Sequence, residues 1–352
     1  ITEVHFKVIQ SSRMRAVLGR DILEKLEQQD YDEQDPLQSE APGYDEKKMI
    51  DNLLEACMDR GILAGLPQLY AVKYRDLIFK QYYRVFRLRL GKGSPACFAP
   101  MQVKTIPGMP LRKGYSLKWN NIPKEAIDEL KVQLDLNKSM GVISDDVPPG
   151  AVLHSLLTVK KPGGGLRWVV TWITANEITI EFYHYAADNA DELQKIMGGA
   201  KYYWLADLTK GYWQVKLHED SQWIFCFATP WGAYKYLRAP MGSKATGPYF
   251  DKCMAGMLEG AELLRRGVVM IHDDHAGYSD TIYDNDPNGR SHYHILRRYL
   301  KMCAELNVRI SPKKFEIFSP RRTSLATFTG EADYDLAQNG TRRLWTNPHP
   351  LR

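Results

Sequence analysis

The chain has 352 residues and a mass of 40.4 kDa, which is enough for two or three subdomains that share a core. Apolar residues make up 44% of it and charged residues 25%, a composition that excludes a wholly disordered chain, a collagen and a coiled coil. The net charge of +5 is too small to indicate a polyanionic partner, so the distribution of charge along the chain carries more information than the total.

The cysteines and the apolar runs indicate the setting in which the chain works. Its five cysteines are odd in number and widely spaced, and they form no CxxC motif or Cys/His cluster. This pattern argues against a disulfide framework or a zinc site and predicts an intracellular, reducing compartment. No apolar run approaches the ~18 residues of a membrane span, so we expect no membrane partner. The chain starts at Ile1 without the pattern of a signal peptide, and we expect it to be a piece of a longer polypeptide.

The first half of the chain is organised in blocks of charge. Seven acidic and no basic residues lie between Asp30 and Glu46, together with prolines and a glycine, which predicts an exposed linker over 27–48. A short helix is predicted over 49–60. Between Lys73 and Lys118, eleven Lys or Arg residues stand against the single Asp76 and alternate with aromatic residues. Such a segment either holds phosphates and stacks bases, or is a solvated basic helix whose rings face the core.

Strands and helices are intermixed over the rest of the chain. Helices are predicted over 123–140, 245–264 and 292–305. Strands are predicted over 154–161, 166–173, 202–208, 214–217, 223–228, 233–237, near 308–310 and near 324–329, and as a hairpin over 267–278. Pro162 to Gly165 form the tip of a glycine-rich hairpin between the first two strands. The elements do not follow a regular βαβ spacing, so we expect an α+β fold with a sheet backed by helices.

Three carboxylates form the strongest chemical feature of the sequence. Asp273 and Asp274 follow the apolar run Val268 to Ile271, and Asp207 ends an otherwise apolar and aromatic strand. Adjacent carboxylates at the tip of a buried hairpin are costly unless a cation neutralises them, although an Asp-Asp pair is also common in plain surface turns. If the strand of Asp207 pairs beside the hairpin, the three groups converge as two-metal phosphoryl transfer requires. The flanking His272 and His275 are expected to hydrogen-bond rather than to bind metal.

The order of motifs from Ala71 to Leu336 resembles the reverse transcriptase domain of gypsy-like LTR retrotransposons, which is related to retroviral polymerases. The resemblance is carried by MGVISDDVPPGAVLHSLLTVKKPGGGLRWVV, GGAKYYWLADLTKGYWQVKLHED, YKYLRAPMGSKATGPYFDKCM, VVMIHDDHAGYSD, LNVRISPKKFEIF and ATFTGEADYD. It implies a right-hand polymerase with fingers and a palm, whose antiparallel palm sheet is backed by helices. It also implies an RNA-directed DNA polymerase in which Asp207, Asp273 and Asp274 hold two Mg²⁺ (or Mn²⁺) ions per active site.

The same resemblance implies an RNA or DNA template with its primer and deoxynucleoside triphosphates as partners, and it assigns nucleotide-binding roles. The residues so assigned are Lys160, Lys161 and Arg167 for the phosphates, Tyr212 under the sugar, Met241, Gly242 and Lys244 near the nucleotide, and Lys313 or Lys314 near the pyrophosphate. Taken singly, each has a plainer interpretation: the paired lysines are often a solvated hairpin tip or exposed charge, and Tyr212 is often a core residue.

The sequence departs from the family pattern at several positions. Ile271 stands where the family normally has Tyr, and His272 where a small or apolar residue is usual. Thr171-Trp172-Ile173 replace an Asp-Tyr-Arg run, and Met241 replaces an aromatic residue or Gln. These changes favour an alternative function, a domesticated or degenerate reverse transcriptase fold that serves as a structural or nucleic-acid-binding subunit of a larger assembly. A third possibility is another palm-type nucleotidyl transferase.

The resemblance and the charge blocks together suggest a division of the chain. The segment RAVLGRDILEKL at 15–26 resembles the end of a retropepsin, but the chain has no Asp-Thr-Gly or Asp-Ser-Gly, so no protease activity is expected. We expect a retropepsin-like remnant over 1–26, the acidic linker over 27–48, a basic and aromatic segment leading into the fingers over 49–120, the fingers over 121–200, the palm with the carboxylates over 201–336, and a tail over 337–352. Further polyprotein domains or a larger complex are expected as partners.

Overall fold

The computed structural model describes residues 43–91, 93–113, 124–160, 166–180, 190–282 and 289–319. The predicted retropepsin-like remnant, most of the acidic linker, the tip of the glycine-rich hairpin, the strand near 324–329 and the tail therefore lie outside the described residues. Within the described ranges, no helix combines the length and the apolar content that crossing a bilayer requires.

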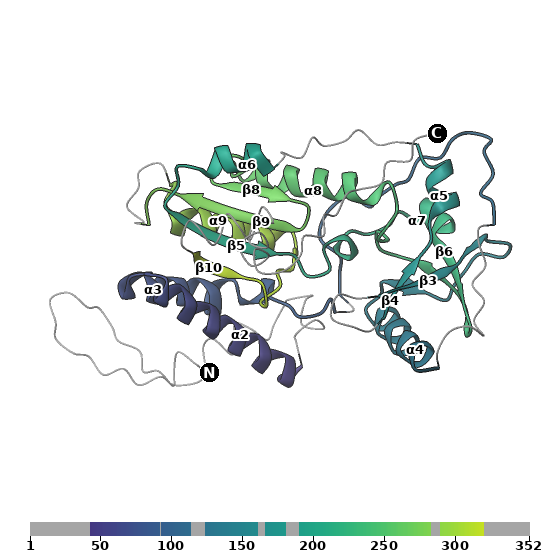
Figure 1. Ribbon diagram of the computed structural model, residues 1–352, viewed down its shortest axis with the longest axis horizontal. Coiled ribbons are helices and arrows are strands. Elements are labelled where there is room, and N and C mark those ends of the chain that lie inside the picture. Colours follow the sequence, from purple (N-terminus) through teal and green to yellow (C-terminus); the bar gives the residue numbers. More distant parts are fainter. Residues whose placement is uncertain are drawn as a thin grey trace, which may run out of the picture. The chain divides into compact units, whose positions relative to one another are not determined.

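A four-stranded antiparallel sheet holds the three carboxylates (Figure 1). Its strands, in spatial order, are β10 (Glu316–Ser319), β5 (Tyr202–Asp207), β9 (Asp274–Ser279) and β8 (Val268–Ile271). The predicted strand that carries Asp207 and the predicted hairpin that carries Asp273 and Asp274 are thus both present, and they are direct neighbours. Strand β10, at the edge, was not predicted from the sequence.

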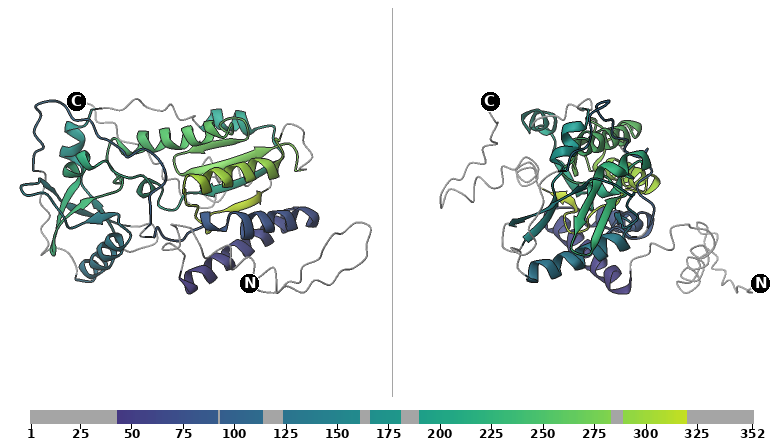
Figure 2. Two further views of the ribbon diagram at one scale, coloured as in Figure 1. Left: turned by 180° about the vertical axis from the view of Figure 1, so that it is seen from behind. Right: turned by 90° about the vertical axis from the view of Figure 1, so that its right-hand side faces the viewer.

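Helices cover both faces of this sheet, which explains why β5 is apolar and aromatic up to its last residue, Asp207. Tyr203 and Leu205 pack on one face in a cluster with α6 (Ala190–Met197). Trp204 faces the other side, where its ring lies 4.7 Å from that of Tyr299 in α9 (His292–Glu305). Figure 2 shows α9 lying across that face. A sheet enclosed in this way requires near-continuous hydrophobic strands instead of an alternating pattern.

The ends of the two long C-terminal helices follow from their local sequence. Helix α9 has the bounds that were predicted, because Ser291 caps it by accepting a hydrogen bond from the amide of His294 and an apolar stripe continues to Cys303. Helix α8 (Thr246–Gly260) is shorter than predicted. It ends where Glu262 takes a positive φ of 52° and Leu263 donates to the carbonyl of Leu258, the pattern of a Schellman motif formed without glycine.

Helix α2 (Tyr44–Leu63) begins earlier than predicted, so the boundary of the linker at residue 48 is wrong. Asp45 and Glu46 occupy its first turn, where negative charge favours a helix N-terminus, and they belong to the helix instead of to a linker. Its buried residues are Ile50, Leu54, Cys57, Met58 and Gly61, and the helix packs on β10, beside which it lies in Figure 1. Close packing against β10 leaves little room for a side chain at Gly61, where an added Cβ would lie 3.0 Å from the side chain of Ile317.

A second four-stranded sheet and a hairpin lie N-terminal to the carboxylate strands or between them. The sheet order is β1 (Ile143–Ser144), β7 (Gly232–Tyr236), β6 (Cys226–Thr229) and β2 (Leu153–His154), and the hairpin pairs β3 (Leu156–Lys160) with β4 (Leu166–Val170). The helices of this region are α4 (Lys124–Ser139), α5 (Ile173–Ile178) and α7 (Glu219–Gln222). Only the β2–β6 pair is parallel.

Several predicted strands differ from the observed elements. The strand over 214–217 is wrong, because a 3₁₀ helix occupies Gly211–Gln214 and Leu217 makes a single bridge to Met101. The strand near 308–310 is also reduced to single bridges, which Ile310 makes to Phe86 and Leu208. The strand over 166–173 ends at Val170, since α5 begins at Ile173. Trp223 to Phe225 form a 3₁₀ turn before β6 begins.

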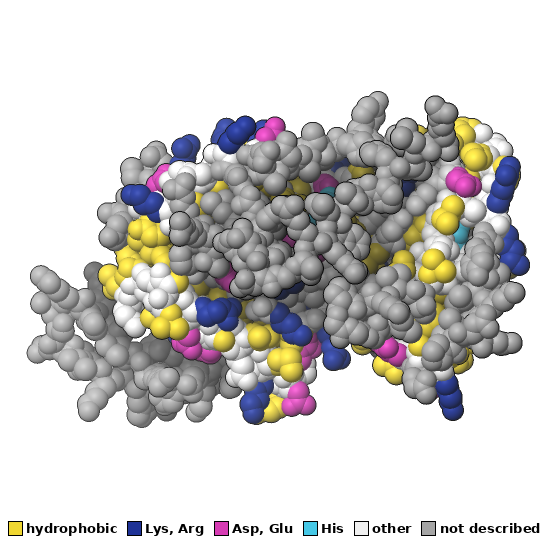
Figure 3. Space-filling model, in the orientation of Figure 1, with side chains coloured by type: hydrophobic (Ala, Val, Ile, Leu, Met, Phe, Trp, Pro, Cys, Tyr) yellow, Lys and Arg dark blue, Asp and Glu magenta, His cyan; other side chains and the backbone are white. Residues whose placement is uncertain are grey.

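The described part of the basic and aromatic segment directs its rings toward the core. It contains α3 (Gln68–Asp76), a π-helical turn over Leu77–Gln81 and a 3₁₀ turn over Tyr83–Val85. Tyr74 and Phe86 are fully buried, and Phe79 packs against the core. On the face shown in Figure 3, charged side chains of both signs are scattered among apolar ones. The plainer of the two interpretations, a basic surface over core-facing rings, therefore fits these residues.

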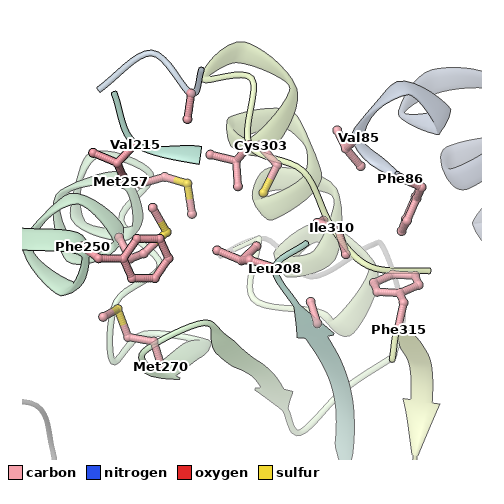
Figure 4. Close-up of a cluster of buried hydrophobic side chains, with 14 of the residues drawn as sticks. Val85, Phe86, Leu208, Val215, Phe250, Met257, Met270, Cys303, Ile310 and Phe315 are labelled. Carbon is pink, nitrogen blue, oxygen red and sulfur yellow. The ribbon is translucent and has the colours of Figure 1, made fainter. Parts of the chain in front are cut away.

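The residues after β5 and before β10 meet in the middle of the core. Leu208 and Ile310 lie between Phe86 and Phe315 on one side and Phe250 on the other (Figure 4). Backbone hydrogen bonds fix this arrangement: the amide of Arg87 donates to the carbonyl of Ile310, and that of Thr209 to the carbonyl of Arg309. Segment 308–311 therefore joins the N-terminal helices to the end of the carboxylate strand.

We expect Gly277→Ala to destabilise the fold by about 3 kcal/mol. An added Cβ at Gly277 in β9 would lie 1.9 Å from the ring of Trp204, which is fully buried and cannot move aside cheaply. Chemical denaturation measures the loss. Gly256→Ala is the control, because no atom lies within 4 Å of its added Cβ, and alanine is the better helix former on the exposed side of α8. Equal stability of the two variants would contradict the expectation.

Candidate active site

The register of the sheet brings the three predicted carboxylates together. Asp207, the last residue of β5, is the direct partner of Asp274, the first residue of β9. Asp273 lies in the two-residue turn that joins β8 to β9, and its carbonyl accepts a hydrogen bond from the amide of Leu208. The carboxylates predicted to converge at one edge of a sheet are therefore neighbours in the structure.

The turn between β8 and β9 is unusual because its first residue is a histidine. His272 has a φ of 53°, a conformation that hairpin turns of this length normally give to glycine or asparagine. Its Nδ1 lies 3.0 Å from Oδ1 of Asp251 on α8. His275 is fully buried, and its Nδ1 hydrogen-bonds to the hydroxyl of Tyr299 at 2.8 Å. The expectation that both histidines hydrogen-bond within the protein is confirmed.

Burial and mutual repulsion disfavour the charged forms of two carboxylates. Burial raises the pKa of Asp273, and the negative charge of Asp207 raises it further. Burial also raises the pKa of Asp274, with additional contributions from the charges of Asp273 and Asp207. The folded chain thus holds negative charge at this edge at a cost in free energy.

One cation from the chain offsets part of this charge. Nζ of Lys314 donates a hydrogen bond to Oδ1 of Asp207 at 2.8 Å, and this bond raises the pKa of the lysine. The amide of Ser311 donates to the carbonyl of Asp207 and so ties the segment that carries the lysine to β5. Of the two lysines predicted from the sequence, Lys314 is at the site, whereas the exposed Lys313 is not among the residues that line the cavity described below.

The donor set fits a divalent cation better than it fits a lysine alone. Three carboxylates supply hard oxygen ligands of the kind that Mg²⁺ prefers, and a single lysine leaves excess negative charge among them. In the described part of the chain, no three His, Cys, Asp or Glu side chains already stand close enough together to form a metal cage.

A cavity of about 400 Å³ opens beside the carboxylates. It is lined by Leu88, Asp207, Leu208, Thr209, Lys210, Gly211, Tyr212, Met241, His272, Asp273, Ser311 and Lys314. Charged groups lie next to a flat ring and an apolar side chain in this lining, which suits a ligand that has both an anionic and an aromatic part.

Tyr212 is half-buried at this cavity and packs edge-on against Phe250 of α8, with ring centroids 5.2 Å apart. Burial raises the pKa of its hydroxyl, and the charges of Asp251 and Asp273 raise it further. The ring is therefore a wall of the cavity that stays neutral. Its core contact and its position at the site are compatible, so the plainer interpretation of this residue does not exclude the functional one.

The loop that carries Met241 and Gly242 is held from α5. Nε1 of the buried Trp172 donates to the carbonyl of Met241 at 2.8 Å. Asn176 donates to the carbonyl of Gly242 and accepts a hydrogen bond from the amide of Lys244. Trp172 also packs edge-on against Phe225 at 5.1 Å. Trp172, the middle residue of the Thr-Trp-Ile run, therefore helps to fix this loop through its indole hydrogen bond and its aromatic packing.

The three predicted phosphate-binding cations belong to the β3–β4 hairpin, whose tip lies outside the described residues. The backbone of Lys160 ends β3 and that of Arg167 lies in β4, opposite Val159, whereas Lys161 is outside the described residues. Sequence reasoning also missed Asp251 and Trp172. The sequence analysis noted Trp172 only as a departure from the family pattern. For Asp251, a carboxylate on the buried face of a predicted helix could have indicated a functional role.

We expect Asp273→Asn to stabilise the free protein at neutral pH. The folded chain protonates Asp273 at a higher pH than the unfolded chain does, so the penalty is fully present above the raised pKa and is relieved as the pH falls through it. The gain in Tm should therefore shrink at acid pH when both proteins are melted in EDTA. Asp280→Asn, at an exposed position just after β9, is the control and should leave the Tm unchanged at both pH values.

Solved structures that share the fold of this chain include foamy viral enzymes. The crystal structure of the prototype foamy virus protease-reverse transcriptase matches 75% of this chain and 33% of its own, with a TM-score of 0.62 and 19% identity. The foamy viral enzyme in complex with an RNA/DNA hybrid matches 75% of this chain and 33% of its own, with a TM-score of 0.60 and 19% identity. These matches confirm the predicted fold, a polymerase fold of α+β class.

Relatives in sequence are polyproteins. The enzymatic polyprotein of figwort mosaic virus is 26% identical over 193 residues, which are 55% of this chain and 27% of that protein. The retrovirus-related Pol polyprotein from transposon 297 of Drosophila melanogaster is 29% identical over 161 residues, 45% of this chain and 14% of that protein. The chain thus spans less than a third of the length of these relatives.

A family model described as "Reverse transcriptase (RNA-dependent DNA polymerase)" matches residues 159–337, which are half of the chain. This range contains the three carboxylates, the cavity-lining Tyr212 and Lys314, and the sheet that positions them. The chain therefore belongs to the reverse transcriptase (RNA-dependent DNA polymerase) family.

Proposed function

We propose that the chain catalyses template-directed nucleotidyl transfer as an RNA-directed DNA polymerase. The observation that carries this proposal is the direct pairing of Asp207 with Asp274, next to a cavity that Asp207, Asp273, Lys314 and the ring of Tyr212 line. The partners that we propose are an RNA or DNA template with its primer and deoxynucleoside triphosphates. The foamy viral enzyme, whose fold this chain shares, was solved with an RNA/DNA hybrid, which supports this choice.

Asp207, Asp273 and Asp274 are the proposed catalytic residues and the ligands of two Mg²⁺ (or Mn²⁺) ions. Such ions, when bound, would activate the attacking hydroxyl and stabilise the leaving oxygen of an in-line displacement. The carboxylates are held by the β5–β9 register, so little reorganisation is needed to receive them. The raised pKa values of Asp273 and Asp274 mean that binding a cation relieves a cost in free energy that the free protein carries.

The other proposed residues orient the nucleotide. Lys314 would stabilise charge on the departing pyrophosphate while Tyr212 and Met241 form the wall of the sugar and base site. Lys313, Gly242 and Lys244 are proposed neighbours of the nucleotide. Lys160, Lys161 and Arg167, on or beside the β3–β4 hairpin, are proposed contacts of its phosphates. Phosphoryl transfer needs little covalent catalysis by the protein, so the positioning of the reactants and the stabilisation of charge account for most of the rate enhancement.

We also propose an origin and a setting for the chain. The transposon 297 relative supports a gypsy-like LTR retrotransposon source, with residues 1–26 as the end of a retropepsin and further polyprotein domains as partners. All five cysteines are free thiols, which supports an intracellular, reducing compartment.

Replacing Asp207 by Asn should abolish nucleotide addition, by at least about 10³-fold, without unfolding the protein. The loss follows from removing one of three charges that hold the cations. Primer extension on RNA and DNA templates measures it, with circular dichroism as the test of folding. Asp280→Asn, an equally conservative change at an exposed position in the same sheet region, should extend primers normally. Undiminished extension by the Asp207→Asn protein would refute the assignment.

Mg²⁺ or Mn²⁺ should raise the Tm of the free protein, because a ligand that binds only the folded state stabilises it. The rise should grow with metal concentration and should be smaller in Asp207→Asn and Asp273→Asn, whereas the Asp280→Asn protein should respond like the wild type. No shift in the wild type, together with no primer extension, would instead favour the alternative function, a degenerate fold that acts as a structural or nucleic-acid-binding subunit.

A further inference from the structure

Asp251 is a buried carboxylate that the proposed reaction does not use. It lies on α8 and is only 5% exposed, and its two carboxylate oxygens lie 3.0 and 3.1 Å from Nδ1 of His272. A buried carboxylate is costly unless a hydrogen-bonding partner compensates it. The partner here is the first residue of the turn that carries Asp273, at the position where the sequence departs from the family pattern.

Two consecutive residues of α8 support two walls of the cavity. Phe250 packs against the ring of Tyr212, and Asp251 binds His272. Both supported side chains line the cavity together with Met241. Since Asp251 occupies the Nδ1 edge of the imidazole, the half-exposed remainder of the ring, with Nε2, is the part available to a ligand. Tyr212 and His272 are therefore fixed relative to each other by one helix.

We infer that Asp251 and His272 act as one unit that sets how tightly the cavity holds the sugar of the incoming nucleotide. In this unit His272 contacts the sugar, and Asp251 is a positioning residue that acts through it. The inference rests on the proposed function. An imidazole that a buried carboxylate already fixes loses little conformational entropy when a sugar hydroxyl binds its free nitrogen. A ring without this support loses more conformational entropy, so it binds the sugar less tightly.

The pair also explains how a histidine is tolerated in the turn. A positive φ at a residue other than glycine costs free energy and persists only where the surroundings enforce it. The two-oxygen contact with Asp251 supplies that enforcement from a helix already fixed in the core by Phe250 and Met254. Removing either member should therefore affect the other, both in stability and in nucleotide binding.

The kinetic test uses Asp251→Asn, His272→Gly, which accepts the positive φ of this turn, and the double variant in single-nucleotide primer extension. Each single change should raise the KM for deoxynucleotides about tenfold and change kcat less than about twofold, the loss expected of one charge-assisted hydrogen bond. The double variant should be no worse than either single one, because the two residues act together. Lys252→Gln, at the adjacent exposed position of α8, is the matched control and should behave as the wild type.

A stability test is independent of activity. His272→Gly adopts the positive φ without strain but leaves the buried carboxylate of Asp251 without its partner, and should lower the Tm by several degrees. Adding Asp251→Asn removes the orphaned charge and should recover most of that loss. Additive losses in Tm and KM, or a loss confined to kcat, would overturn the inference while leaving the proposed function intact. A wild-type protein that adds no nucleotide to any primer would overturn both, even if the Tm values remain coupled.

Discussion

The ladder between β5 and β9 is the constraint on which the core and the candidate site both depend. Its register sets Asp207 against Asp274 at one end and Trp204 against Gly277 in the middle. Because side chains alternate between faces along a strand, a slip of one residue would turn the indole toward the opposite face and separate the carboxylates. The fit of a large ring over a glycine thus fixes the geometry of three charged groups several residues away.

That geometry is maintained against repulsion. Three carboxylates lie close together, and Lys314 partly neutralises them by its hydrogen bond to Asp207. The amide of Ser311 joins the segment of this lysine to β5. Around them, neutral side chains hold the backbone, as in the hydrogen bond from the indole of Trp172 that holds the Met241 loop. Charge is concentrated where a cation and phosphates can meet it, and neutral groups do the positioning. An active site is a reasonable place for a fold to accept such local cost.

The sequence predicts most reliably where a signal is local. Helix α9 was predicted with its observed bounds because its cap and its apolar stripe are both contained in it. The convergence of the carboxylates was also predictable, since a buried strand and a buried hairpin that both carry acids have few ways to be stable apart. Long-range packing defeated the prediction elsewhere: β10 is a strand only because β5 lies beside it. The roles of Trp172 and Asp251 depend on hydrogen-bonding partners 69 and 21 residues away in the sequence. A tryptophan or an aspartate in the sequence does not indicate such a partner.

The packing of α2 on β10 has a consequence for how the protein forms. Arg60 donates a hydrogen bond to the carbonyl of Phe315 across 255 residues, and the apolar stripe of α2 rests on the strand that follows. During synthesis this helix leaves the ribosome long before its partner strand exists. Its stripe must stay in water, or be sheltered by a chaperone, until residue 319 has emerged. Contacts of such separation close slowly, so we expect the packing of α2 on β10 to form together with the bond of Lys314 to Asp207 just before that strand.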